Sequence, residues 1–291
     1  MAYGFSAYFL WGFLPLYFHL LDDVGSVEIV VNRIVWSFLL LLPILALRGA
    51  LGEFLRLVRT GTAMLTLTVT SALIAINWLV YIWAVNNGHV VAASLGYFLN
   101  PLVNVLLGFA ILKERLGRVQ WAAVALAAIG VAILAASALN TLWISLALAG
   151  SFAFYGLIRK LSPVTALQGL AAETLILTPF SLLYLAGLGS AAAFASASLA
   201  TNGLLALSGV ITSVPLLLFA VAAKRLRYST LGLLQYIAPT LQFLIGVLVF
   251  KETLSDGQMA SFALIWVGLI LYTADSLRHA RAERRVLPGI E

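Results

Sequence analysis

The sequence predicts an all-α integral membrane protein of ten transmembrane helices, arranged as two inverted repeats of five helices. Three observations predict this fold: the composition, the spacing of the apolar runs, and an internal repeat. Of the 291 residues, 63% are hydrophobic and only 10% are charged, and the mean hydropathy is +1.05. A soluble domain carries about 25% charged residues. So few charges cannot form a water-facing surface for a chain of this length.

Apolar runs of about 20 residues recur along the whole chain, which is the length needed to cross a hydrocarbon core of about 30 Å. Short connections separate them, and the longest are 48–61 and 187–202. The N-terminus lacks the basic region and cleavage site of a secretory signal peptide, so we expect the first run to be a retained helix. The predicted spans are 3–20, 27–47, 62–85, 90–112, 119–138, 141–158, 165–186, 203–223, 228–250 and 258–277.

The orientation follows from the positions of Lys and Arg, which concentrate in cytoplasmic segments of membrane proteins. With a cytoplasmic N-terminus and ten alternating helices, 15 of the 17 basic residues, Arg159 among them, fall in cytoplasmic segments. Only Lys251 lies outside, and Arg33 lies within a helix. We therefore expect a multi-pass protein of the bacterial inner membrane with both termini in the cytoplasm.

An internal repeat divides the chain at a constant offset of 138 residues. The predicted units are residues 1–138, residues 139–277 and a basic cytoplasmic tail, 278–291. Because each unit holds five helices, an odd number, the second must enter the membrane upside down. Inverted repeats of this kind are typical of secondary transporters, with the substrate site near the midplane between them. The offset maps Pro101 to Pro239, Gly108 to Gly246, Lys113-Glu114 to Lys251-Glu252 and Gly130 to Gly268.

Polar and aromatic side chains gather deep in the predicted spans of both repeats. Tyr97, Asn100 and Asn104 share one face of their helix, and Gln235 and Gln242 occupy the repeat positions of Tyr97 and Asn104. A single amide can simply join two helices by a hydrogen bond, but several on symmetry-related helices favour a wet central cavity. The candidate cavity residues are Trp11, Tyr17, Asn77, Trp78, Tyr81, Tyr97, Asn100, Asn104, Tyr155, Gln235, Tyr236 and Gln242.

Three prolines inside spans are candidates for helix breaks or gating. Pro101 and Pro239 are related by the repeat and lie about 18 Å into their helices, near the midplane; Pro215 lies in the span 203–223. A proline removes one intrahelical hydrogen bond and kinks a helix. These positions are either paired breaks at a substrate site or tolerated packing kinks.

Two ionisable residues lie within spans, where charges are costly and usually functional. Arg33 lies in the second span and could alternatively extend to the outer headgroups. Glu173 lies in the seventh span, and no partner of opposite charge is evident for it. We therefore expect Glu173 to face the cavity and to exchange protons, which makes the proton a possible coupling ion.

Other classes of protein find little support. The chain has no cysteine, and its three histidines form no ligand cluster, so we expect no catalytic residue, no metal and no cofactor. The net charge of +6 reflects orientation, so we expect no nucleic-acid partner. The expected partners are a small-molecule substrate and the lipid bilayer, for a monomer or weak homo-oligomer. An intramembrane enzyme or a passive channel remains the alternative.

Several strings resemble the RarD proteins of the EamA family, in the drug/metabolite transporter (DMT) superfamily. The resemblance covers essentially the whole chain and is carried most specifically by NRIVWS (32–37), ASLGYFLNPLVN (93–104) and STLGLLQYIAPT (229–240). It implies ten helices, cytoplasmic termini, and a cavity lined by the first, third, fourth, sixth, eighth and ninth helices. It also implies a transporter that exports metabolites or drugs, and a family label of chloramphenicol sensitivity. The first span lacks the Glu that small multidrug relatives carry there.

Overall fold

A computed structural model of the chain describes residues 1–87, 89–136, 142–189, 192–193, 198–249 and 256–286. The regular secondary structure of these residues is helical throughout. The α-helices are α1 (Ala2–Gly12), α2 (Leu14–His19), α3 (Ser26–Leu47), α4 (Leu51–Leu57), α5 (Gly61–Asn86), α6 (Val90–Ala110), α7 (Arg118–Ala136), α8 (Leu142–Leu161), α9 (Ala166–Leu188), α11 (Leu199–Arg225), α12 (Tyr228–Leu234), α13 (Ile237–Leu248) and α14 (Asp256–Val286).

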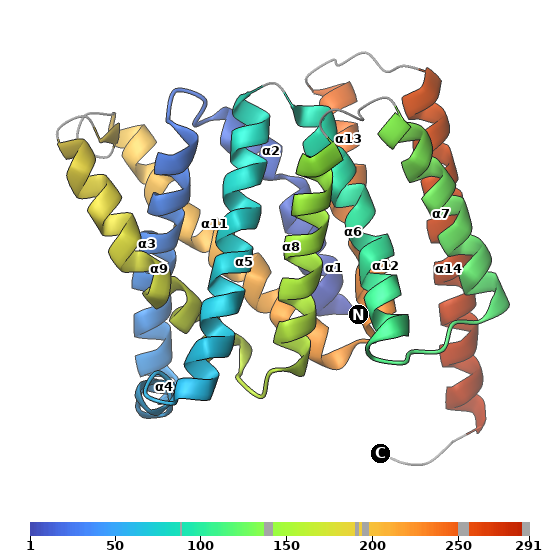
Figure 1. Cartoon of the computed structure of the whole chain (residues 1–291), viewed down its shortest axis with the longest axis horizontal. Coiled ribbons are helices and arrows are strands. Elements are labelled where there is room, and N and C mark those ends of the chain that lie inside the picture. The colour runs from blue at the N-terminus through green and yellow to red at the C-terminus, as the bar shows by residue number, and fades with distance from the viewer. Residues whose placement is uncertain (88, 137–141, 190–191, 194–197, 250–255, 287–291) are drawn as a thin grey trace.

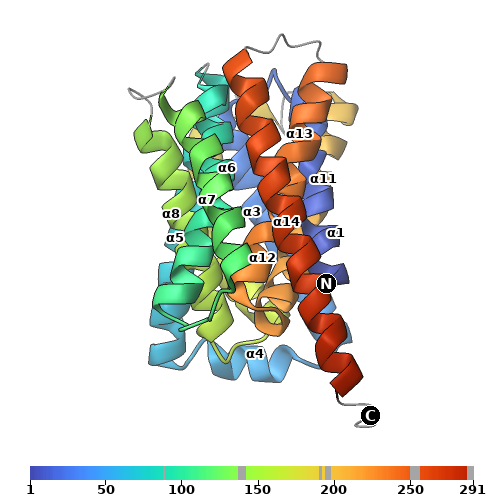
Figure 2. The same cartoon turned by 90° about the vertical axis from the view of Figure 1, so that its right-hand side faces the viewer.

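Most of these helices run along one common direction, and their connections lie at the two ends of the bundle (Figures 1 and 2). One end carries α4, the connection between α6 and α7, and the junction between α11 and α12. We call this the basic end, because Arg56, Lys113, Arg115 and Arg227 belong to these segments. The start of α1 and the end of α14 lie toward the same end.

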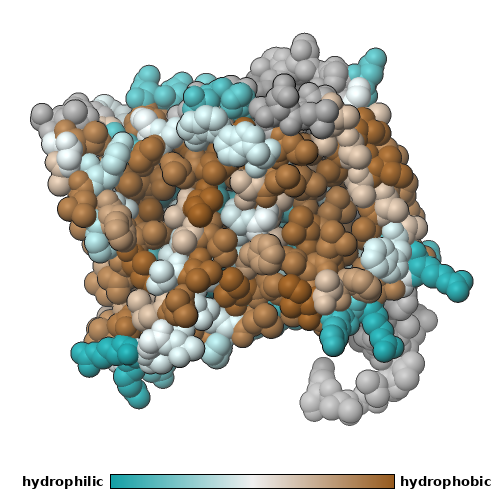
Figure 3. All heavy atoms as spheres, viewed as in Figure 1, coloured by the Kyte–Doolittle hydropathy of each residue, from teal (hydrophilic) through white to brown (hydrophobic). Residues whose placement is uncertain are grey.

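The surface has the pattern of a membrane protein. In Figure 3 hydrophobic residues cover most of the middle of the visible face, and hydrophilic residues gather at the two ends. Among the described residues, five helices are long and apolar enough to cross a membrane by length and composition: α3, α5 (over Gly61–Ala84), α8, α9 and α11. Shorter apolar helices lie in α6, α7 and α14. The chain is an all-helical membrane protein, as predicted.

Two predicted spans are each divided into two helices. The span 3–20 consists of α1 and α2, and the span 228–250 of α12 and α13. Pro15 and Pro239 each stand at the beginning of the second helix, where a missing N–H costs least. At both junctions the backbone tightens, since Phe13 N–H donates to Leu10 O (3.2 Å) and Tyr236 N–H to Leu233 O (3.2 Å).

For Pro101 and Pro215 the structure favours the second of the two interpretations, a proline tolerated within the helix, over a helix break. α6 continues through Pro101, and α11 continues through Pro215. Both prolines are buried among neighbouring helices, so packing supports the helical backbone despite the one lost hydrogen bond. Of these three prolines, only Pro239 lies beside an interruption, which falls at Gln235 and Tyr236, in the turn before it.

Two boundaries also differ from the prediction. The connection 48–61 contains the short helix α4, which Phe54 anchors by burying its ring in the core. The tail predicted from residue 278 begins inside α14, which continues to Val286. Charged side chains are compatible with helical backbone once they leave the lipid, so α14 continues beyond the predicted span into the predicted tail.

The pair of α7 and α14 stands at one edge of the bundle (Figure 1). Glycines let the two backbones approach closely. A Cβ added to Gly130 of α7 would lie 2.8 Å from Ser261 O of α14, and one added to Gly268 of α14 would lie 2.7 Å from Ala123 O of α7. Each glycine therefore faces a backbone carbonyl of the opposite helix.

Candidate central cavity

A cavity lies in the middle of the bundle, at the level where α1 meets α2 and α12 meets α13. Its volume is about 50 Å³, room for a few water molecules at about 10–15 Å³ each. Pockets for small ligands usually measure about 300–1,000 Å³, so this conformation holds the cavity nearly closed. The lining residues are Tyr8, Trp11, Leu14, Phe18, Arg33, Asn77, Trp78, Tyr81, Tyr97, Phe152, Leu216, Gln235, Ala238, Pro239 and Gln242.

Aromatic rings form most of the apolar wall. Trp11 of α1 meets Phe152 of α8 edge-on, with ring centroids 5.7 Å apart. On another side, Tyr81 of α5 and Tyr97 of α6 pack edge to face at 5.1 Å. Such rings present flat, polarisable surfaces with a few polar edges. The wall therefore suits a molecule with a planar or apolar part.

The helix junctions bring amides to the cavity. Pro15 cannot donate to the carbonyl of Trp11, and the side chain Nε2 of Gln242 donates to that carbonyl instead at 3.1 Å. Gln235, at the α12–α13 junction, accepts at Oε1 from Asn104 Nδ2 at 2.9 Å. Both bonds join the first predicted repeat to the second.

Asn77 is the third amide of the wall. Its Nδ2 donates to Leu148 O at 2.9 Å and to Ser151 Oγ at 3.0 Å. Both N–H bonds are therefore directed at α8, and the side-chain oxygen is the remaining hydrogen-bonding group. Asn77 ties α5 to α8 and also borders the cavity.

Arg33 is the one charged residue among those that line the cavity. Its side chain is only 4% exposed, so it does not extend to headgroups. Its Nε donates to Thr212 Oγ1 of α11 at 2.9 Å. Its guanidinium carbon lies 5.0 Å from the ring centroid of Trp78 and 5.5 Å from that of Phe18, both within the range of cation–π attraction.

The structure brings many, but not all, of the predicted site residues to this cavity. Trp11, Arg33, Asn77, Trp78, Tyr81, Tyr97, Gln235, Pro239 and Gln242 line it. The residues that sequence analysis did not propose are Tyr8, Leu14, Phe18, Phe152, Leu216 and Ala238. Tyr8 precedes Trp11 by three residues, so helical spacing could have identified it. Apolar residues such as Leu216 carry no such signal.

The remaining predicted residues lie around the cavity and do not line it. Tyr17 donates its hydroxyl to Leu204 O at 2.9 Å. Asn100 is fully buried in α6, and Asn104 reaches the cavity only through Gln235. Tyr236 is buried against Phe98. Pro101 and Pro215 are interior helix positions, and Tyr155 belongs to a separate polar cluster with Glu173.

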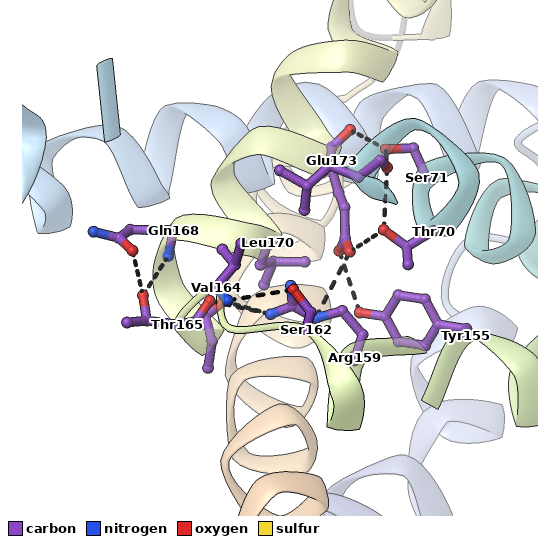
Figure 4. Close-up of polar contacts among 12 residues, drawn as sticks. Thr70, Ser71, Tyr155, Arg159, Ser162, Val164, Thr165, Gln168, Leu170 and Glu173 are labelled. Atoms are coloured by element: carbon purple, nitrogen blue, oxygen red, sulfur yellow. Dashed lines mark hydrogen bonds and ion pairs between the residues drawn. The ribbon is translucent and has the colours of Figure 1, made fainter. Parts of the chain in front are cut away.

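Glu173 lies at the centre of this cluster, which Figure 4 shows with its side chains directed toward one another. Thr70 Oγ1 of α5 donates to Glu173 Oε1 at 2.7 Å, and the Tyr155 hydroxyl of α8 donates to Oε2 at 3.2 Å. Arg159 Nε lies 3.8 Å from Oε1, and both charged side chains are only 1% exposed.

Two sequence-based expectations for Glu173 were therefore wrong. It has a partner of opposite charge, Arg159, and it does not line the cavity. Arg159 stands two residues before the end of α8, so its position was indistinguishable from that of a loop charge. Its side chain packs instead over Gly169 of α9, where the added Cβ of an alanine would lie 1.8 Å from Nη1. The missing side chain at Gly169 makes room for the guanidinium.

A second, partly buried carboxylate, that of Glu114, lies at the basic end. Glu114 accepts from Tyr228 N–H (2.6 Å), Ser229 N–H (3.0 Å) and the Ser229 hydroxyl (2.6 Å). It therefore caps the first turn of α12, and Arg227 lies 3.9 Å away. The counterpart Glu252 lies outside the described residues.

The fold and the cavity define a multi-pass helical membrane transporter, and comparisons with known proteins agree. The EamA-like transporter family matches residues 1–136. A RarD protein of Streptomyces exfoliatus is 47% identical over 98% of this chain and 91% of its own length. An uncharacterized transporter of Pseudomonas aeruginosa is 45% identical over 96% of this chain and 94% of its own. The chain belongs to the RarD proteins of the EamA family.

A solved structure described only as "Crystal structure of protein" has the same fold. It covers 94% of this chain and 96% of its own chain with a TM-score of 0.72 and 20% identity. The relatives are transporters, not enzymes.

Proposed function

We propose that this transporter is a secondary active carrier that moves a small molecule by alternating access around the central cavity. It has ten transmembrane helices in two inverted five-helix repeats, residues 1–138 and 139–277. It lies in the bacterial inner membrane with both termini in the cytoplasm, and its physiological direction is export. The observation that carries the proposal is a nearly closed cavity lined by residues of both repeats.

The path of the chain supports ten crossings. If α1 with α2 and α12 with α13 each count as one interrupted crossing, successive long helices run alternately toward opposite ends in Figure 1. α4 lies across the basic end and adds no crossing. Interrupted helices beside a central site are typical of carriers with inverted repeats.

The contacts between α7 and α14 support the inverted symmetry. Adding the offset of 138 to Gly130 gives Gly268, and adding it to Ala123 gives Ser261. Gly130 faces Ser261, and Gly268 faces Ala123. Contacts that exchange in this way are the signature of a two-fold axis between two equivalent elements. Other equivalent helices also pack together, namely α3 with α9 and α6 with α12.

The basic end is closed by contacts that join the two repeats. Glu114 binds the first turn of α12, and Arg227 Nη2 donates to Arg115 O at 2.6 Å. Thr70 binds Glu173 closer to the centre. Opening the cavity toward this end requires these bonds to break or to exchange partners. The excess of Lys and Arg here supports a cytoplasmic basic end.

Protons remain our candidate for the coupling ion. Glu173 is buried and ion-paired in this conformation, so proton exchange would require the basic end to open and admit water. In that event the carboxylate would exchange Arg159 or Thr70 for water, which would give protons a route to and from it. Coupling and gating would then be two consequences of the same rearrangement.

Reconstitution in liposomes tests the proposal. The purified chain is screened with metabolites and drugs as unlabelled internal compounds, and uptake of the corresponding labelled compound is measured with and without a pH gradient. A carrier gives saturable uptake that internal compound accelerates. Flux that never saturates and ignores internal compound would identify a channel and refute the proposal.

A further inference from the structure

Arg33 carries a buried positive charge that the protein leaves uncompensated. Among the described residues, the ion pairs are Arg159 with Glu173 and Arg227 with Glu114, and neither involves Arg33. Glu28, five residues earlier on α3, directs its carboxylate to the backbone N–H of Ala193. Burial of an unpaired charge is costly, so its retention at this depth calls for an explanation.

The contacts of Arg33 use only part of its binding capacity. A guanidinium has five N–H donors in a planar fork, and the structure directs one, Nε–H, to Thr212. Trp78 and Phe18 contact the charge through their ring faces and supply no acceptor oxygen. The outer edge of the fork, with its two terminal nitrogens, is the part that matches a carboxylate in bidentate fashion.

The surroundings of Arg33 limit what could complete the site. The cavity lining contains no acidic side chain, so the local field is positive and favours an anion. A single cation neutralises a monoanion, whereas a phosphate dianion would leave one negative charge without a partner. The rings of Trp11, Tyr81 and Tyr97 on the other walls offer contact for an apolar, planar body.

We infer that the cavity binds small organic monocarboxylates with an apolar or aromatic body, and that Arg33 receives the carboxylate. This inference rests on the proposed carrier function, because it assigns the substrate class of the same cavity. Thr212 is the positioning residue, since its hydroxyl accepts from Nε at 2.9 Å and leaves the two terminal nitrogens for the ligand. The rings of Trp78 and Phe18 lie against the guanidinium and stabilise its charge.

Calorimetric titration of the full chain in lipid nanodiscs tests this inference without any transport measurement. The probes are three acids, propionate, 3-phenylpropionate and indole-3-propionate, each paired with its neutral amide. The wild-type chain should bind the two ring-bearing acids at least about 10-fold more tightly than their amides, because only the acid forms charge-assisted hydrogen bonds. Propionate should bind more weakly than both ring-bearing acids.

Three variants test whether Arg33 causes the preference for acids over amides. Arg33→Gln should abolish the preference for acid over amide, and Arg33→Lys should keep a reduced preference, because a lysine retains the charge and loses the bidentate fork. Arg56→Gln, at an exposed arginine of α4, is the matched control and should keep the full preference. If Arg33→Gln fails to fold, the acid–amide comparison in the wild type and in Arg33→Lys still decides.

Equal binding of acids and amides by the wild type, or binding of none of the six probes, would overturn the inference. A preference that survives in Arg33→Gln would also overturn it. The outcome is separate from that of the carrier proposal. The acids could bind as inferred to a protein that shows channel-like flux. Saturable exchange together with equal binding of acids and amides would support the carrier while refuting the carboxylate site.

Discussion

The ion pair between Arg159 and Glu173 permits a quantitative prediction. Both side chains are 1% exposed, so replacing either one by leucine leaves the other charge buried without its partner. Loss of one partner of a buried pair costs about 3–5 kcal/mol. We expect Glu173→Leu and Arg159→Leu each to lower the free energy of unfolding by about this amount.

The double variant Arg159→Leu/Glu173→Leu should be much more stable than the sum of the single variants predicts. Replacing both members of a buried pair by apolar residues of similar volume is often neutral or stabilising. Part of this gain is offset here, because Thr70 and Tyr155 lose the acceptor that they share. We expect a coupling energy of about 2–3 kcal/mol between the two sites, at the upper end of the range of about 0.5–3 kcal/mol for contacting residues.

Reversible unfolding in mixed detergent micelles, followed by far-UV circular dichroism, gives the four free energies of this double-mutant cycle. Arg56→Leu, which removes an exposed arginine, serves as control and should change stability by less than about 0.5 kcal/mol. Strict additivity of the two single variants would refute the reasoning, as would single variants no less stable than this control.

Three further predictions concern packing, capping and the cavity. Gly130→Ala and Gly268→Ala should each destabilise the chain by about 1–3 kcal/mol, because both place a Cβ under 3.0 Å from a backbone carbonyl. Gly150 has open space around it, so Gly150→Ala should be neutral or stabilising. Equal stability of all three variants would contradict the proposed contact between α7 and α14. Glu114→Ala removes three hydrogen bonds from the start of α12 and should lower the free energy of unfolding by about 2–3 kcal/mol in the same assay. A change below about 0.5 kcal/mol would exclude the capping role. Gln242→Leu should reduce transport in liposomes at least several-fold while the protein remains folded, because the amide borders the cavity and joins α13 to α1; normal transport would remove it from the site.

Hydropathy predicted the course of the chain well, because a helix in lipid satisfies its backbone within a local segment. The helices between Ser26 and Arg225 follow the predicted spans closely. The junctions at Phe13 and Gln235 could not be read from composition. Proline marks a position where a helix can be interrupted, but packing decides whether it is: α6 continues through Pro101, whereas the helix with Pro239 does not.

The site was only partly predictable for a related reason. Tyr97, Asn100 and Asn104 share one face of α6, but that face meets two environments. Tyr97 borders the cavity, and Asn104 is directed toward Gln235 of the opposite repeat. Helical spacing identifies residues that point the same way, and only the docking of neighbouring helices decides which of them reaches an open space.

Sequence analysis missed the ion pair of Glu173 because Arg159 reaches it only through the length of its side chain. Arg159 belongs to the last turn of α8, where sequence reasoning places charges in water. A long arginine side chain can extend back into the bundle, and Gly169 leaves room for it. Burial of both charges follows from this fit between an arginine and a glycine, which no hydropathy profile records.

The central claim is that the two halves of the chain enter the membrane in opposite directions and enclose the cavity between them. The chain contains no cysteine, so single cysteines can be introduced without further changes at Leu116 and at Ser255, which is one residue from the repeat position of Leu116. Their labelling by a membrane-impermeant maleimide in intact cells tests the claim directly. We predict that the cysteine at position 255 is labelled in intact cells and that the one at 116 is labelled only after the membrane is opened. Labelling of both from the same side would contradict the inverted repeat and the transport mechanism built on it.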